Sequence, residues 1–283
     1  MILPFRSLFI LIFFATAAGC VNLKEVGSFA KVSQEITDKN KDISYGYYDY
    51  LHDSAYIFHS MPDKLWDLDC RCEAVKEADS SLRNECVILS AYFGKLALFA
   101  DPRSAIDLNP IGRSVNAGAY GSLTITTQEA NIAAGLAKGL SDLFTTGYKS
   151  RKIKQFIRIY HDSVAPLISL LAIRANSFAG RIGNLQQRLT TDADTLLHRI
   201  KKKEERDVNH INLNEMRWPI VISYERQMKD LAAIIDLYSH REMDFIRILN
   251  AGQLIYQNAE NLRSKDFRKK LKDMVSDLAL NAN

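Results

Sequence analysis

One long apolar stripe constrains the fold of this chain more than any other feature. Between Ile153 and Ile200, apolar residues recur at alternating steps of three and four, a spacing that places their side chains on one face of an α-helix. The pattern predicts a helix over residues 149–205, roughly 85 Å long at about 1.5 Å per residue. Pro166 is expected to kink this helix without ending it. Such a stripe is buried only against helices of comparable reach, which favours an elongated bundle.

Other parts of the chain show the same helical periodicity. Thr126 and Glu129 have the spacing of a capping box, in which each side chain accepts from the other residue's backbone N–H, so a helix is expected to begin there. Proline and glycine mark the expected ends, because proline cannot continue a helix and glycine favours its C-terminus. Helices are therefore expected over residues 23–61, 63–78 and 82–99, from Thr126, from about Asn212 to Gly252, and from Ser264.

The composition agrees with a helical fold. The 283 residues include only 13 glycines and 6 prolines, which disfavours a turn-rich β-sandwich or barrel. The apolar fraction of 47% and the charged fraction of 25% are typical of a folded protein. The net charge of +4 is modest for this length and indicates no nucleic-acid partner. We therefore expect an all-α fold, an elongated bundle of long antiparallel, coiled-coil-like helices.

The clearest break in the helical pattern lies at residues 101–122, which hold two prolines and three glycines. The segment lacks the G-K-[ST] signature of a phosphate-binding loop, and a long surface loop of this kind often carries function. It separates a helical region over residues 20–100 from a long-helix region over residues 123–283. We expect these two regions to pack as one bundle, after an N-terminal signal segment over residues 1–19.

The N-terminal segment has the layout of a signal peptide. Arg6 supplies a positive charge, the stretch from Leu8 to Phe14 is apolar, and small residues follow. A transmembrane helix needs about 20 predominantly apolar residues, and the polar sequence after Val21 does not extend the run. Cleavage of the segment is therefore favoured over a membrane span.

The residues Ala17-Ala18-Gly19-Cys20 resemble the lipobox of bacterial lipoproteins, although Ala17 stands where that family more often has Leu. The resemblance covers only the first 20 residues. It implies cleavage after Gly19 and a diacylglyceryl group on the Cys20 Sγ, with acylation of the new amine. Firm attachment needs two or three acyl chains. Val21, where an Asp commonly marks inner-membrane retention, implies the periplasmic face of the outer membrane.

Three further cysteines, Cys70, Cys72 and Cys86, remain after Cys20. In an oxidising compartment an odd number leaves one disulfide and one free thiol. Cys70 and Cys72 are too close together to pair comfortably, so a bridge from Cys86 to one of them is expected to staple two helices. Three free thiols are the alternative, and a zinc site is disfavoured because no second ligand pair stands at the required spacing.

No catalytic motif is present in the chain. It lacks H-E-x-x-H, G-x-S-x-G and G-x-G-x-x-G. The nearest group of metal-ligand types is Asp49, His52, Asp53 and His59, which would need a partner helix to hold an ion; a hydrated polar face explains the same residues. We expect no catalytic residue, no metal and no cofactor.

A dense group of tyrosines falls in the same region. Such density is typical of a binding surface, because tyrosine offers a large amphipathic face at low entropic cost. The alternative is that the rings pack on a neighbouring helix. The residues of this possible interaction surface are Tyr45, Tyr47, Tyr48, Tyr50 and Tyr56.

Together these features predict a lipid-anchored cell-envelope scaffold or binding protein without catalytic activity. Its partners would be the membrane, through the anchor, and a protein or cell-wall component met near the turn at residues 201–214. One alternative is a protective lipoprotein of the immunity or exclusion type that holds a toxin in a helix groove. Another is a membrane-remodelling bundle that inserts residues 130–144.

Overall fold

The computed structural model describes residues 23–58, 72–100, 118–120, 123–142, 149–204 and 214–282. Predictions that concern other residues lie outside these ranges. They are the lipobox with Cys20, the cysteine Cys70, the histidine His59, most of the loop at 101–122 and the turn at 205–213.

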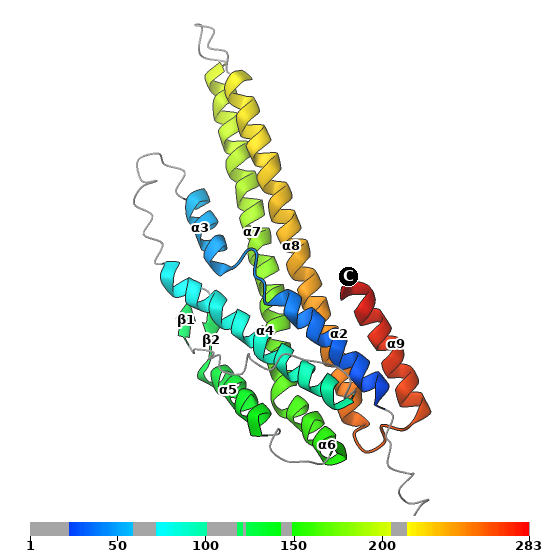
Figure 1. The fold of residues 1–283 in the computed structure, drawn as a ribbon. Helices are drawn as coiled ribbons and strands as arrows, with labels where there is room; N and C mark the ends of the chain where they lie inside the picture. The colour runs from blue at the N-terminus through cyan, green and yellow to red at the C-terminus, as the bar shows by residue number, and fades with distance from the viewer. Residues whose placement is uncertain are drawn as a thin grey trace, which may run out of the picture.

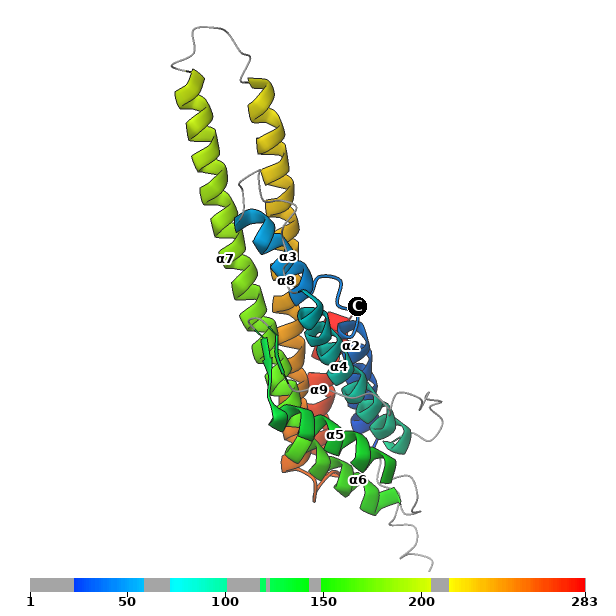
Figure 2. The ribbon, with the colours of Figure 1, turned by 90° about the vertical axis from the view of Figure 1, so that its left-hand side faces the viewer.

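The described residues form an elongated helical bundle (Figure 1). Two long helices, α7 (Ala165–Glu204) and α8 (Asn214–Gln257), lie antiparallel along its length. At about 1.5 Å per residue their 40 and 44 residues span roughly 60 and 65 Å. The other helices gather at one end, which we call the base, and α7 and α8 project beyond them at the other end (Figure 2). The prediction of an all-α, elongated bundle is confirmed.

Seven shorter elements complete the base. Among them, α2 packs on α4, α9 and α8, and α9 packs on α8; α3 lies beside the middle of α7 (Figure 1). Their bounds are α2 (Lys24–Asn40), α3 (Tyr47–Phe58), α4 (Cys72–Ala100), α5 (Thr127–Asp142), α6 (Lys149–Ile159), α9 (Lys265–Ala282) and a ribbon of β1 (Gly118–Tyr120) and β2 (Leu123–Ile125).

A single hydrophobic core joins the two regions on either side of residues 101–122. Phe29 from α2 packs edge-on against Phe93 from α4, with ring centroids 5.7 Å apart. The same core includes Leu167 and Ile168 from α7 and Leu271 from α9, all of them fully buried. Burial of this apolar surface is the main force that holds the base together.

The long helix predicted at 149–205 is present, with a wide turn before its proline. A single π-helical turn, η3 (Tyr160–Val164), connects α6 to α7, and the N–H of Ala165 donates to the carbonyl of Tyr160. Pro166 has no N–H to donate to the carbonyl of Asp162, and its ring would clash with that carbonyl in a regular helix. Both figures show α6 set at an angle to α7, so the predicted kink is confirmed.

Two predicted helix boundaries in the N-terminal region are wrong. Residues 23–61 do not form one helix, because the chain turns between α2 and α3. The carboxylate of Asp79 on α4 starts α3 by accepting from Tyr47 N and Tyr48 N at 2.9 and 3.0 Å, and a Cβ at Gly46 would lie 2.4 Å from this carboxylate. The expected break between 78 and 82 does not occur either, since α4 runs through it.

The described part of the loop predicted at 101–122 is a strand. Residues 118–120 form β1, which pairs antiparallel with β2 in the register Gly118 to Ile125. The capping box that follows is confirmed: Thr126 N donates to the Glu129 carboxylate, and Glu129 N donates to Thr126 Oγ1 at 3.2 Å.

Candidate functional site

Buried tyrosines tie the helices of the base together through hydrogen bonds to backbone carbonyls. Tyr92 on α4 donates to the carbonyl of Phe156 at 2.9 Å, and Tyr238 on α8 donates to that of Tyr45 at 2.7 Å. Tyr160 in η3 donates to the carbonyl of Ile248 on α8 at 3.1 Å. Burial raises the pKa of all three hydroxyls, so they remain protonated donors. These hydrogen bonds are directional, whereas the apolar packing between the helices is not.

Gly252 provides the space for the Tyr160 ring. A Cβ at this position would lie 1.9 Å from the ring carbon Cζ and 2.0 Å from the hydroxyl oxygen, distances at which the ring would have to move. The prediction that α8 stops near Gly252 is wrong for this reason. The glycine serves a close contact between η3 and α8, and the helix continues to Gln257.

A buried ion network joins three helices beside the core. Arg174 on α7 donates to both oxygens of Glu85 on α4, at 3.1 and 2.9 Å, and its Nη2 lies 2.8 Å from Glu129 Oε1 on α5. The Glu85 side chain is 0% exposed and that of Arg174 is 10% exposed. Buried charges of this kind are stable only when they are paired and hydrogen-bonded.

The network holds one cation and two carboxyl groups. Burial raises the pKa of Glu85 to about 7, Arg174 opposes that rise, and Glu129 adds to it. Glu129 also closes the capping box of α5. Arg174 therefore fixes the start of α5 to the middle of α7, and Glu85 gains a proton more readily than an exposed glutamate.

A bridge from Cys86 to Cys72, one of the two predicted pairings, is excluded by the structure. Both residues belong to α4, fourteen positions apart, which corresponds to roughly 21 Å along the axis and excludes a bridge. Cys86 is a free, buried thiol. Burial, reinforced by Glu85, raises its pKa to about 12, so it is protonated and unreactive at neutral pH.

Of the two interpretations of the tyrosine group, the structure supports packing on a neighbouring helix rather than an interaction surface. The rings of Tyr45, Tyr47 and Tyr50 surround Phe178 on α7, with centroid distances of 6.4, 4.5 and 5.8 Å. Tyr47 is buried, and Tyr48 lies under the Lys76 ammonium, 4.9 Å from its ring centroid. The side chain of Tyr56 lies outside the description. The cluster attaches α3 to α7, which corrects the interpretation of Tyr47 as part of an interaction surface.

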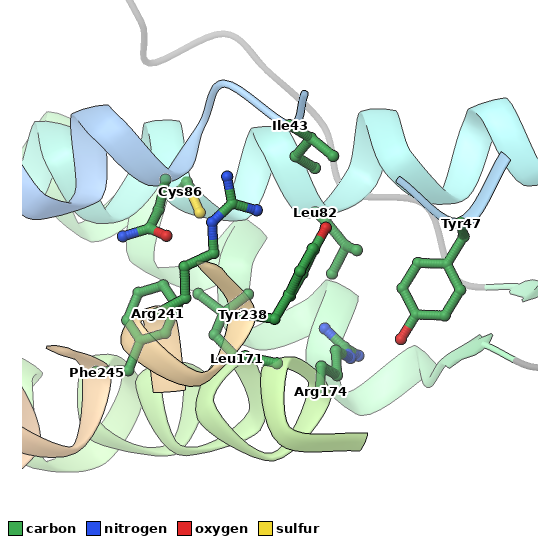
Figure 3. A pocket seen from close by; sticks show the side chains of 11 residues that line it. Ile43, Tyr47, Leu82, Cys86, Leu171, Arg174, Tyr238, Arg241 and Phe245 are labelled. Carbon is green, nitrogen blue, oxygen red and sulfur yellow. The ribbon is translucent and has the colours of Figure 1, made fainter. Parts of the chain in front are cut away.

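A small cavity lies where the turn between α2 and α3 meets α4, α7 and α8 (Figure 3). Its volume is about 40 Å³, room for two or three water molecules at about 10–15 Å³ each and far below the 300 Å³ or more of typical ligand sites. Arg241 closes one side: it donates to the carbonyl of Asp42 at 3.1 Å and lies 4.8 Å from the Tyr238 ring centroid. The cavity is part of the packing of the base.

The metal-ligand types singled out on α3 have other partners. Asp49 accepts from Gly46 N at 2.8 Å, and Asp53 accepts from the Tyr45 hydroxyl at 2.8 Å. His52 Nδ1 lies 3.5 Å from Asp53 Oδ1. Within the described ranges no group of three or more His, Cys, Asp or Glu residues is placed to hold a metal ion.

The part of α7 and α8 that projects beyond the base is the candidate functional site. This arm comprises residues 186–204 and 214–230. Thr190 Oγ1 lies 3.1 Å from the Tyr224 hydroxyl, and Gln186 donates to the carbonyl of Met228 at 3.3 Å, which sets the antiparallel register. No side chain described in the arm is buried, whereas Leu185 and Leu231, next to it, both are.

Apolar side chains are exposed on the arm. Trp218 is 66% exposed and Ile222, one helical turn further along α8, is 51% exposed; Leu196 on α7 is exposed as well. A hollow of about 340 Å³ at the foot of the arm, lined by Tyr45, Asp53, Leu185, Gln227, Asp230, Leu231 and Ile234, separates it from α3. Exposed large apolar side chains that lie near one another are typical of interaction sites.

One helix, Lys154–Lys202, is long and apolar enough to cross a membrane by length and composition alone. This is weak evidence, because a long core helix passes the same test. Arg174 lies in its middle and pairs with buried carboxyl groups of α4 and α5.

Comparison with protein-family models, with curated proteins and with solved structures finds no match to this chain. The functional interpretation of the candidate site therefore rests on its geometry alone.

The sequence did not predict the ion network or the hydrogen bonds from buried tyrosines to backbone carbonyls. Arg174 stands among apolar residues in the segment LLAIRANSF, and a charge inside an apolar stripe is a usable signal for a buried pair. Its partners Glu85 and Glu129 are 89 and 45 positions away along the chain, and no periodicity connects them. The spacing of Gly46 and Asp49 was a sequence signal for the start of α3, because the Gly46 N–H donates to the Asp49 carboxylate three residues later.

Proposed function

We propose that this chain is a lipid-anchored scaffold or binding protein of the cell envelope that holds a protein partner with its arm and has no catalytic activity. One observation carries the proposal: the arm is a pair of helices with no buried side chain described, and it exposes Trp218 and Ile222 one turn apart. A third helix from a partner would bury these side chains, as in helix-in-groove recognition. Exposed aromatic residues are common anchors of such interfaces.

The lipid anchor is the second part of the proposal. It is supported by the resemblance of residues 17–20 to a lipobox, with Cys20 as the acylated residue, and Val21 favours the periplasmic face of the outer membrane. Cys20→Ala should abolish labelling of the protein by radioactive palmitate. Cys86→Ala, which removes a buried free thiol, is the matched control and should be labelled normally. Equal labelling of both variants would refute the anchor.

Site-specific photocrosslinking in living cells tests the arm. A photoreactive amino acid in place of Trp218 should yield one dominant crosslinked protein, and the added change Ile222→Asp should abolish it. The same amino acid in place of Asn176, an exposed residue of α7 in the base, is the control. Equal crosslinking from both positions would refute the arm as the binding site. A crosslink to an added toxin would assign the protein to the immunity type.

A further inference from the structure

Positive charge is concentrated in two short segments of the base. Residues 149–158 hold five basic residues and no acidic one, and residues 263–272 hold six basic residues and one acidic one. Each segment therefore has a net charge of +5, against +4 for the whole chain. The remainder of the protein is consequently net negative when taken as a whole.

Both segments begin at the same end of the molecule, opposite the arm. The helices α2, α6 and α9 all start there (Figures 1 and 2). Lys154 on α6 forms an ion pair with Glu260 in the turn between α8 and α9, which brings the two basic segments together. Arg158, one turn further along α6, is exposed.

Three lysines of α9 face directly away from the core. Lys265, Lys269 and Lys272 recur at steps of four and three, which places them on one face of the helix, and all three are exposed. The opposite face carries the buried residues Phe267 and Leu271. Acidic residues are also present and exposed on α9, at Asp266, Asp273 and Asp277, but they do not fall on the lysine stripe.

The short stretch of chain between Cys20 and α2 places this end of the base close to the proposed lipid anchor. The first described residue, Leu23, follows Cys20 by three positions, a reach of at most about 11 Å. If Cys20 is acylated, as proposed above, the start of α2 lies within that distance of the membrane interface. The two basic segments begin at the same end and are thereby brought to the headgroup layer.

We propose that the base is a membrane-docking surface for anionic phospholipid headgroups, with the lysine stripe of α9 and Arg158 of α6 as its contacts. The inference rests on the proposed anchor for its orientation. Clustered basic residues bind anionic bilayers electrostatically and act as a second signal beside an acyl chain. The arm, with Trp218, lies at the opposite end of the bundle from the end where these basic segments begin (Figures 1 and 2).

Vesicle partitioning tests this surface without the lipid. The chain from residue 20 with Cys20→Ser retains every contact reported above, because these lie within residues 23–282. It should sediment with vesicles of equal parts phosphatidylcholine and phosphatidylglycerol and not with phosphatidylcholine alone. The variant Lys265→Gln/Lys269→Gln/Lys272→Gln should partition about a hundredfold more weakly, at about fivefold for each lysine.

A matched control variant removes three positive charges from the arm, at the opposite end of the molecule. Arg199, Lys201 and Lys202 are exposed on the arm, and their joint replacement by Gln should change partitioning less than about fivefold. Equal losses in the two variants, a larger loss in the arm variant, or no binding to anionic vesicles would each overturn the proposal. Palmitate labelling of Cys20 is measured separately, so failure of the anchor and failure of the docking surface are distinguishable.

Discussion

The base and the arm are built from the same two helices but differ in what surrounds them. In the base, Leu171, Phe178 and Ile182 of α7 are buried, and α7 packs on α3, α5 and α8. In the arm, the same three-four periodicity continues, yet only one neighbour is present and no described side chain is buried. Two helices shield only the seam between them. One sequence pattern therefore provides a core where helices surround it and a partner surface where they do not.

The two regions also differ in the environment of their charged side chains. The base pairs Arg174 with Glu85 and Glu129 out of water, whereas Arg199, Lys201 and Lys202 of the arm are solvated. Substitutions in the base should thus alter the free energy of unfolding, and those in the arm should alter binding. Three comparisons between base and arm test this division, and a pair of glycine substitutions tests the packing of the base itself; the largest expected effect comes first.

Truncation of one aromatic residue in each region gives the most direct comparison. Phe178→Ala removes the ring that Tyr45, Tyr47, Tyr50 and Tyr238 contact and should lower the free energy of unfolding by about 3–5 kcal/mol. Trp218→Ala should change it by less than about 0.5 kcal/mol. Urea denaturation followed by circular dichroism measures both, and a comparable cost at residue 218 would show that the arm is buried in solution.

Removal of one arginine from each region tests the ion network. Arg174→Leu leaves Glu85 and Glu129 without their cation and should cost about 3–5 kcal/mol, because an unpaired carboxylate remains buried. Arg199→Leu in the arm should cost less than about 0.5 kcal/mol. If the two variants unfold at the same urea concentration, the network does not contribute to the stability of the base.

Two glycine substitutions should change stability in opposite directions. Gly252→Ala places a methyl group on the Tyr160 ring and should cost about 2–3 kcal/mol through overpacking and loss of the hydroxyl bond. No neighbouring atom lies within 4 Å of a Cβ at Gly180 on α7, so Gly180→Ala should add about 0.5–1 kcal/mol through helix propensity. A destabilised Gly180→Ala variant would contradict the described packing of α7.

The pH dependence of stability should originate in the base. Glu85 has a pKa of about 7 in the folded state, above its ordinary 4.5, so folding favours its protonated form. Its contribution to the free energy of unfolding should fall by on the order of 2–3 kcal/mol as pH rises from about 4.5 to about 7, and then remain constant. Glu85→Gln should flatten this part of the profile, whereas Glu225→Gln in the arm should not. Parallel profiles for Glu85→Gln and the unaltered protein would exclude Glu85 as the source.

Local patterns predicted the helices and some of their ends well. The stripe from Ile153 to Ile200 predicted the long helix and Pro166 its kink, because both depend on neighbours within one or two turns. The capping box at Thr126 was correct for the same reason. The turn between α2 and α3 was missed because Asp79, which starts α3, is 32 positions from Tyr47.

The sequence by itself determined the class of fold: its apolar periodicity and scarcity of glycine and proline allow little other than long helices. Only the tertiary structure decided which part of each stripe is core and which is surface. Leu185 and Leu189 belong to one stripe, but the first is buried and the second only half-buried. Burial depends on neighbours distant in the chain, and a period of three and four carries no information about those neighbours.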